Sequence, residues 1–155
     1  MIISTWNVRG LNQPLKQKEL KLFLQKHKID PLGCLETRVK QFKSQTILNK
    51  VAHGWNSKCN YLEAVNGRIW LLWRSTTQVK ILETNEQFMQ CYVENQSGSL
   101  KAYVTIVYAR NTATERTPLW SALVRMGATI TDPWVLSGDI NSVLSSFDRL
   151  GSDIC

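Results

Sequence analysis

The sequence predicts a layered α/β sandwich built as a single domain. The first observation is the order of its elements: strand–helix–strand, then a block of strands, then helix–strand. The second is the length of 155 residues, enough for one domain with a core of its own. The third is the composition, 43% hydrophobic and 20% charged residues, which is ordinary for a globular protein.

The first third of the chain alternates strands and helices. Residues 2–6 have the pattern of a short strand, closed by a turn that contains Gly10. Residues 15–28 form the clearest helix, because apolar side chains recur at helical spacing and lysines occupy the other face. An apolar strand over 32–35 follows, and then a second predicted helix over 44–51 with Ser44 as its N-cap.

The middle of the chain is predicted to be β-structure. Asn66-Gly67 is a typical hairpin turn, and residues 96–99 predict a second one. The expected strands are Trp55–Leu62, Arg68–Trp73, Val79–Glu83, Phe88–Glu94 and Leu100–Tyr108.

The last predicted elements are a helix and a strand. Thr117 as cap and Pro118 as first residue predict a helix that runs to about Met126. The apolar run 134–136 then predicts a buried strand that leads into Gly138.

The net charge of +7 is unevenly distributed. Residues 1–58 carry eleven Lys and Arg against three acids, a net charge of +8, whereas residues 59–155 carry −1. A basic segment of this kind favours a polyanionic partner. The alternative is that its lysines are only the solvated face of a helix.

Several classes of protein are disfavoured. The four cysteines are scattered without C-x-x-C spacing, so we expect neither a zinc site nor disulfides. No apolar run is long enough for a membrane span, and the N-terminus has no basic leader. We therefore expect an intracellular protein without a membrane partner.

Polar side chains follow four of the predicted strands. An Asp and an Asn stand side by side in S-G-D-I-N at 137–141, after the last strand. Such a pair at the mouth of a sheet suits hydrolysis of a phosphate by a positioned water. The residues at the other strand ends are Asn7, Glu36 and Tyr108 with Asn111. Each of these alone is most often a turn former, a solvated carboxylate or a core aromatic.

Four motifs in order carry a resemblance to a known family. They are W-N-V-R-G-L-N at 6–12, L-E-T-R at 35–38, Y-A-R-N at 108–111 and S-G-D-I-N at 137–141. Together they resemble the endonuclease/exonuclease/phosphatase superfamily. With D-R-L-G at 148–151, the chain is similar over essentially its whole length to the apurinic-endonuclease-like domain of plant LINE-type (non-LTR) retroelements.

This resemblance implies a four-layered α/β sandwich (α+β) and nicking of DNA by Mg²⁺-dependent hydrolysis, with Mn²⁺ as a possible substitute. It implies that Glu36 is the metal ligand and that Asn7 helps to orient the network of groups around the metal. It also implies that Asp139 positions or deprotonates the attacking water. Tyr108 would stabilise charge on the scissile phosphate, and Asn141 would hold the phosphate or a water. The residues expected to contact DNA are Arg9, Asn111, Lys16, Lys18 and Lys21. The expected partner is DNA, with no obligate protein partner, and a functional protein of this kind would act in the nucleus.

The chain departs from the family pattern at two points. Many apurinic endonucleases have an acidic residue where this chain has Arg9. Family members also continue to a Ser-Asp-His motif, whereas this sequence stops at Cys155, and Ser152-Asp153-Ile154 is not that motif. We therefore expect a single C-terminally truncated domain over 1–155, with one sheet nearly whole and the other short of strands, and little or no activity.

Truncation would also uncover part of the core. Either Trp70 and Leu72 or Val104 and Ile106 would then lose cover. Two alternatives stay open for the function. One is a non-catalytic remnant of a decayed retroelement with at most weak nucleic-acid binding, and the other is a small-molecule phosphatase of the same superfamily.

Overall fold

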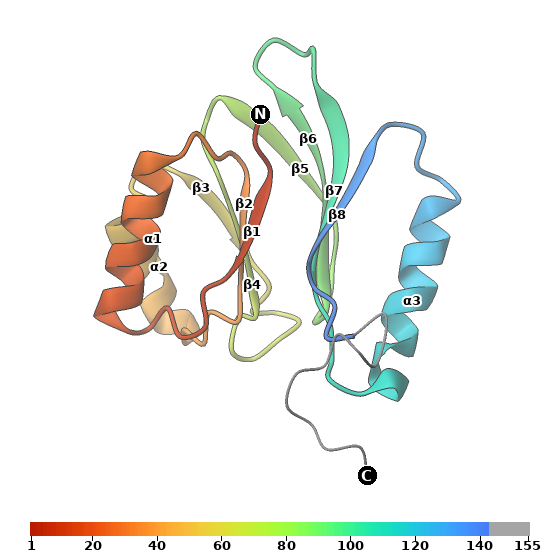
Figure 1. Cartoon of the computed structure of the whole chain (residues 1–155), viewed down its shortest axis with the longest axis horizontal. Helices are drawn as coiled ribbons and strands as arrows, with labels where there is room; N and C mark the ends of the chain where they lie inside the picture. The colour runs from red at the N-terminus through yellow and green to blue at the C-terminus, as the bar shows by residue number, and fades with distance from the viewer. Residues whose placement is uncertain (143–155) are drawn as a thin grey trace.

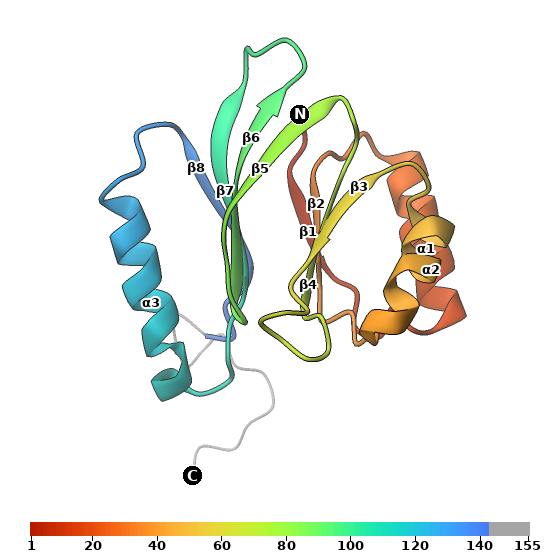
Figure 2. The ribbon, with the colours of Figure 1, turned by 180° about the vertical axis from the view of Figure 1, so that it is seen from behind.

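A computed structural model describes residues 1–142 and shows four layers, helix–sheet–sheet–helix (Figure 1). The elements in chain order are β1 (Ser4–Asn7), α1 (Pro14–Lys26), β2 (Leu32–Leu35), α2 (Gln41–Val51), β3 (Asn56–Cys59), β4 (Ile69–Trp73), β5 (Thr77–Thr84), β6 (Phe88–Asn95), β7 (Lys101–Tyr108), α3 (Ala113–Gly127) and β8 (Trp134–Asp139). Helices α1 and α2 cover the first sheet and α3 covers the second, as the view from behind also shows (Figure 2). The four-layered α/β sandwich is confirmed. The D-R-L-G segment at 148–151 and Cys155 lie outside the described residues.

The strands divide equally between the two sheets. The first sheet has the order β1-β2-β4-β3 and the second β5-β6-β7-β8. Strands β1 and β2 run parallel, as do β7 and β8, and the remaining neighbours are antiparallel. The expectation of one whole and one depleted sheet is wrong for residues 1–142. The reason is that β3 and β4 pair with β2, so the predicted block of strands is split between the sheets.

The main core lies between the sheets. It joins Leu71 of the first sheet to Val104 and Ile106 of the second, all with no exposed surface. Because side chains alternate along a strand, Trp70 and Leu72 face the other way, toward α1 and α2, and are also fully buried. The expectation that truncation leaves part of the core exposed is therefore wrong for Trp70, Leu72, Val104 and Ile106, all of which are fully buried.

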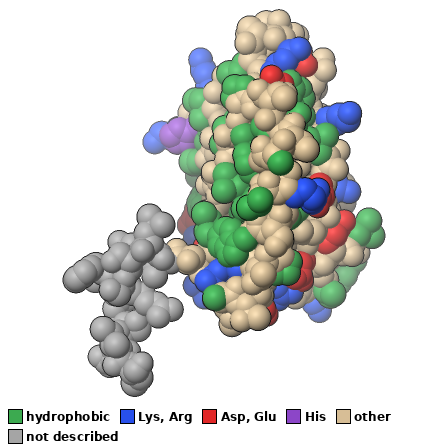
Figure 3. Space-filling model, turned by 90° about the vertical axis from the view of Figure 1, so that its right-hand side faces the viewer, with side chains coloured by type: hydrophobic (Ala, Val, Ile, Leu, Met, Phe, Trp, Pro, Cys, Tyr) green, Lys and Arg blue, Asp and Glu red, His purple; other side chains and the backbone are tan. Residues whose placement is uncertain are grey.

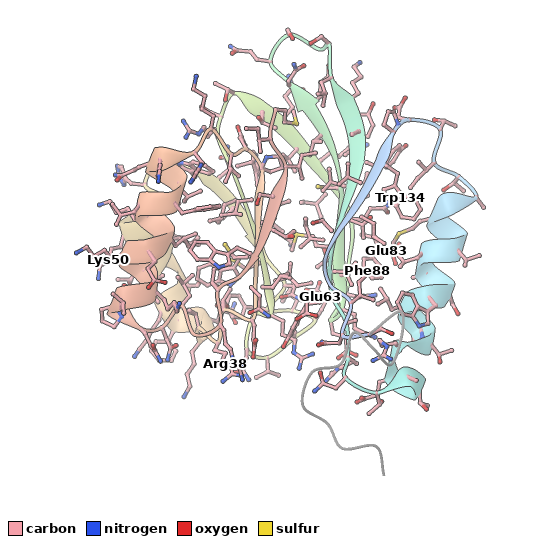
Figure 4. All side chains as sticks on the ribbon, in the orientation of Figure 1. Arg38, Lys50, Glu63, Glu83, Phe88 and Trp134 are labelled. Carbon is pink, nitrogen blue, oxygen red and sulfur yellow. The ribbon has the colours of Figure 1, made fainter. Side chains whose placement is uncertain are left out.

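A second packing layer lies between the second sheet and α3. Phe88 and Trp134 point from the sheet toward this helix (Figure 4), where Leu119 and Met126 meet them. On the outer side of α3 hydrophobic side chains gather near the middle of the face (Figure 3), and the exposed Trp120 belongs to this helix.

Two predicted helix starts are wrong. Helix α3 begins after Thr112, whose hydroxyl oxygen accepts from the backbone N–H of Glu115 and donates to its carboxylate, so that this cap fixes the start at Ala113, five residues before Pro118. Helix α2 begins at Gln41, and the Ser44 hydroxyl donates to the Gln41 carbonyl (2.6 Å) instead of capping.

The parallel pairs bring four strand ends to one end of the sandwich. Strands β1, β2, β7 and β8 all finish at the lower end in Figure 1. Helices α1 and α2 end toward the opposite end of the molecule, and in the sequence His27 and His53 come directly after these two helices. Within the described part of the chain, no helix is long and apolar enough to cross a membrane.

Candidate active site

The two sheets are linked at this end by Asn7 and Asp139, the last residues of β1 and β8. The Nδ2 of Asn7 donates to Oδ2 of Asp139 at 3.2 Å. Two residues earlier on each strand, the hydroxyls of Thr5 and Ser137 lie 2.8 Å apart. These paired contacts place the ends of β1 and β8 side by side.

Contacts at the end of β8 fix the position of Asp139. Gly138 has φ +140° and lies against the backbone of Val107, so a side chain would not fit there. The backbone N–H of Asn141 donates to Oδ1 of Asp139 at 3.1 Å. Both carboxylate oxygens thus accept hydrogen bonds, one from the side chain of Asn7 and one from the backbone of Asn141.

Asn141 is itself used to build the loop. Its backbone is in the left-handed region, with φ 49°. Its Nδ2 donates to the carbonyl of Ala109 at 2.6 Å. One N–H of the amide is therefore used within the loop, while the second N–H and the Oδ1 have no protein partner within residues 1–142 and can serve a phosphate or a water.

Glu36 follows β2 and is also held in the left-handed region, with φ 54°. A non-glycine residue in this region marks local strain that is often found at functional sites. Its side chain is 15% exposed and forms an ion pair with Arg38, while Nε of Arg9 lies 3.7 Å from the same carboxylate oxygen. Arg38 lies at the lower end of the molecule in Figure 4.

Tyr108 ends β7 beside an arginine that the sequence analysis did not select. The Arg68 guanidinium lies over the Tyr108 ring, 5.1 Å from its centroid. Burial, followed by the charge of Glu36, raises the pKa of Tyr108, while Arg68 acts in the opposite direction. The phenol is therefore neutral at physiological pH and can donate a hydrogen bond.

Arg116 of α3 is a second functional residue that sequence reasoning missed. It is 9% exposed, and its Nη1 donates to the carbonyls of Arg110 (3.0 Å), Asn111 (2.7 Å) and Asn141 (2.8 Å). It therefore ties the loop after β7 to the loop after β8. No local pattern marked it, because the predicted helix began with Thr117 as its cap and left Arg116 outside, whereas the observed helix begins at Ala113.

The predicted site residues line adjoining hollows. One hollow has a volume of about 870 Å³ and lies among the ends of β1, β2 and β8 and the loop after β7. Its lining residues are Thr5, Asn7, Leu35, Asn111, Arg116, Gly138, Asp139, Ile140, Asn141 and Ser142. A smaller one of about 140 Å³ is lined by Glu36, Arg38, Asn66, Arg68 and Tyr108. A third hollow shares Asn111 with the first and both Arg68 and Tyr108 with the second. The residues predicted from the strand ends therefore form one continuous region.

The predicted DNA-contacting lysines lie elsewhere. Lys18 and Lys21 are exposed on α1, in the outer helical layer, and Lys16 pairs with Glu19 at 2.8 Å. Only Arg9, 73% exposed, and Asn111 stand at the strand ends. The structure does not bring the three lysines into the hollows.

The donor set at the site fits a weakly held magnesium ion. Within residues 1–142, no group of three or more His, Cys, Asp or Glu side chains comes together. Magnesium in phosphate-handling sites, however, takes only one or two carboxylates and fills its shell with water and substrate oxygens. The Glu36 carboxylate can supply that protein share, and Asn7, which pairs in the sheet with the preceding Leu35, carries an amide oxygen that accepts the backbone N–H of Arg9 at 3.3 Å.

The fold is shared with solved structures of low sequence identity. The D. rerio TDP2 complex with a single-strand DNA product has a TM-score of 0.63 at 18% identity, over 90% of this chain and 60% of that one. An AP endonuclease from Leishmania major gives 0.67 at 16%, over 96% and 57%. A mannosyl-6-phosphatase from Bacteroides thetaiotaomicron gives 0.63 at 10%, over 90% and 64%.

The chain thus spans less than two thirds of the length of each of these structures. None of the curated protein sequences compared with it matches. The sequence pattern of the Endonuclease/Exonuclease/phosphatase family, however, matches residues 4–154. With the fold and this match over nearly all of its length, the chain belongs to the Endonuclease/Exonuclease/phosphatase family, whose members are hydrolytic nucleases and phosphatases.

Proposed function

We propose that the chain is the phosphodiesterase domain of a LINE-type retroelement endonuclease, which nicks DNA with the help of Mg²⁺. The observation that carries this proposal is the contact of Asn7 with Asp139, which unites the two sheets at the end where Glu36 and Tyr108 also stand. A carboxylate, an amide and a neutral phenol at one rim are the groups that hydrolysis of a phosphate diester requires.

Each residue has a distinct task in this proposal. Asp139, whose two carboxylate oxygens accept hydrogen bonds from Asn7 and Asn141, orients a water and accepts its proton as the water attacks phosphorus and the bond from phosphorus to the leaving sugar oxygen breaks. Tyr108 donates its phenolic hydrogen bond to a phosphate oxygen on which negative charge accumulates. Glu36 and Asn7 would hold the metal. When bound, Mg²⁺ polarises the phosphoryl oxygen and neutralises part of its charge.

Three features support DNA as the substrate and a retroelement origin. Residues 1–58 carry a net charge of +8, which suits a polyanion. The residues of the motifs at 6–12 and 148–151 resemble the sequence pattern of the plant LINE group. Among the similar folds, one is an AP endonuclease and another was solved with a single-strand DNA product. The proposed place of action is the nucleus.

No histidine is among the described residues that line these hollows, so the site lacks an imidazole. Absence of one preorganised group that stabilises the transition state costs on the order of 10²–10³-fold in rate. The isolated chain should therefore nick DNA only weakly. Added imidazole should diffuse into the open hollow and recover part of that loss.

A plasmid-nicking assay tests the proposal. Supercoiled plasmid is incubated with the chain in Mg²⁺, in Mn²⁺ and in EDTA, each with and without imidazole. We expect slow nicking that requires metal, rises with imidazole and disappears in Asp139→Asn. Asp132→Asn is the control, because Asp132 accepts a hydrogen bond from Tyr92 away from the site. Equal nicking in EDTA or in Asp139→Asn, or none under any condition, would contradict the proposal.

One observation favours a second function, binding of nucleic acid without hydrolysis. Arg38 and Arg9 both approach the Glu36 carboxylate, at the place where a metal ion would bind. If these cations keep the metal out, DNA binding should survive in EDTA while nicking stays absent with Mg²⁺ and imidazole. The same assay, run beside a binding measurement, separates the two functions.

A further inference from the structure

Backbone hydrogen bonds of the first sheet hold Arg68 beside Glu36, the candidate metal ligand. It stands directly before β4, and its carbonyl accepts the backbone N–H of Glu36 at 2.9 Å. The hydroxyl of Thr37 donates to the carbonyl of Gly67 at 2.7 Å. These two bonds continue the pairing of β2 with β4 beyond the strand ends, so Arg68 is carried to the rim with Glu36.

The side chain of Arg68 then crosses to the other sheet. It is half-buried and lies over the ring of Tyr108 of β7 in a cation–π contact, with 5.1 Å between the guanidinium carbon and the ring centroid. In this position it lines two hollows, one with Glu36 and Arg38 and the other with Asn111. When a guanidinium lies over an aromatic ring, its N–H donors stay in its own plane and are not used by the ring. They can therefore reach a ligand at the edge of the ring.

The other arginines at this end have partners. Arg38 pairs with Glu36, Arg110 pairs with Glu86, and Arg116 donates to three carbonyls. Arg68, by contrast, forms no ion pair and no side-chain hydrogen bond with any residue in 1–142. A half-buried cation that retains its donors, beside a phenol that also donates, is a site for an anion with several oxygens.

We propose that Arg68 is a phosphate-binding residue, which holds a DNA phosphate at the edge of the Tyr108 ring. This inference rests on the proposed function for the identity of the ligand. The electrostatic coupling of the pair agrees with it, because the charge of Arg68 acts to lower the pKa of Tyr108 against the effect of burial. A negatively charged phosphate would be held by both groups, one contributed by each sheet.

A second contact between an arginine and an aromatic ring, Arg74 over Trp55, provides a matched control. Arg74, at the other end of β4, lies 4.8 Å from the centroid of the Trp55 ring and has a carbonyl partner in Leu24. Replacing Arg74 by Gln removes the same charge and the same kind of stack, but at the end of the sandwich away from the site. Loss of packing alone would therefore affect both variants alike.

The test measures binding of a short fluorescent DNA duplex in EDTA over a range of salt concentrations. We expect Arg68→Gln to weaken binding about tenfold and to reduce the slope of log K against log salt by about 0.9, the value for one phosphate contact. Arg68→Lys should keep the slope, since its charge remains, with a smaller loss of affinity. Arg74→Gln should change neither quantity. Thermal melts of all variants and the pKa of Tyr108 from NMR report whether the fold and the stack persist, and that pKa should rise in Arg68→Gln.

An unchanged slope in Arg68→Gln, or an equal change in Arg74→Gln, would overturn the inference. Its failure is distinct from failure of the proposed function. A normal Arg68 effect in EDTA without any nicking in Mg²⁺ and imidazole would overturn the hydrolytic function alone. Metal-dependent nicking without an Arg68 effect would overturn the phosphate-binding role alone.

Discussion

The side chains of Asn7 and Asp139 meet at 3.2 Å although 132 residues separate them in sequence. The contact exists only when β1 of the first sheet and β8 of the second finish at the same level. Formation of the candidate site is therefore linked to correct stacking of the two sheets, and a change in this pair should affect stability as well as function.

We first predict that Asn7→Asp makes stability depend on pH. The new carboxylate would face Asp139, and two like charges at this distance disfavour ionisation of both, so the pKa of the pair rises. A raised folded-state pKa contributes stability at low pH that is lost as pH rises through it. The variant should thus melt close to the wild type near pH 4 and well below it at pH 7. Asn56→Asp, an exposed change at the start of β3, is the control and should show no such difference. Equal melting of Asn7→Asp and wild type at pH 7 would show that the pair is not in contact.

A second prediction concerns competition between arginine and metal at Glu36. Arg38 pairs with the carboxylate that is proposed to bind Mg²⁺, so Arg38→Ala should strengthen Mg²⁺ binding by removing a competing cation. Glu36→Gln should weaken it. The control is Glu83→Gln, because Glu83 pairs with Arg125 in a similar way but on a different part of the fold. Isothermal titration calorimetry measures the affinities, and identical values for wild type and Glu36→Gln would refute the ligand assignment.

The lysines of α1 provide a third prediction. If Lys16, Lys18 and Lys21 contact DNA phosphates, replacing all three by Gln should flatten the salt dependence of binding by up to about 2.7 in slope, because each contact contributes about 0.9. The control triple is Lys26, Lys28 and Lys50, exposed residues near the far ends of α1 and α2. An unchanged slope, or the same change in the control, would mean that the α1 lysines are only a solvated helix face.

Strand positions were predictable because the chain carries local signals for them. Residues 32–35 are a continuous apolar run and form β2 with these same bounds. Gly138 could be predicted as a turn glycine, but the structure includes it in β8, since its φ of +140° and the parallel pairing with β7 keep it in the ladder. The predicted start of α3 at Thr117 is wrong, because Thr112 caps the helix five residues earlier through its hydrogen bond with Glu115.

The polar residues at the strand ends could also be predicted, whereas their neighbours could not. Asn7, Glu36, Tyr108 and Asp139 follow apolar runs, and parallel pairing brings such positions together. Arg68 and Arg116 act through contacts with residues far away in sequence, Tyr108 and Asn141 among them. No local pattern specifies such contacts, because they depend on how one sheet lies on the other and where α3 packs.

A fourth prediction uses the two glycines Gly138 and Gly54. Both have positive φ, but a side chain at Gly138 would collide with the backbone of Val107, whereas nothing lies within 4 Å of the corresponding position at Gly54. Gly138→Ala should therefore cost at least about 2 kcal/mol, and Gly54→Ala about 1 kcal/mol, the ordinary penalty of the left-handed region. Thermal or chemical unfolding of the two variants measures the difference. Equal losses would mean that the end of β8 can shift away from β7.

The last prediction concerns the edges of the two sheets. Within residues 1–142, β1 pairs only with β2 and β8 only with β7, so each presents one edge without a neighbouring strand. Leu136 of β8 is 42% exposed, which adds an apolar side chain to this edge. Exposed apolar edge strands promote pairing between molecules, and a lysine on such a strand opposes it.

Leu136→Lys should therefore reduce self-association of the 155-residue chain. Leu62→Lys is the matched control, because Leu62 is 87% exposed but lies in a loop without a strand edge. Light scattering during size-exclusion chromatography, with binding of a dye for apolar surface, measures the effect. If strand edges cause association, only the β8 variant becomes more monomeric and binds less dye. If both leucine variants behave alike, general surface hydrophobicity is the cause, and if the wild type is already monomeric without dye binding, the edges are covered in solution.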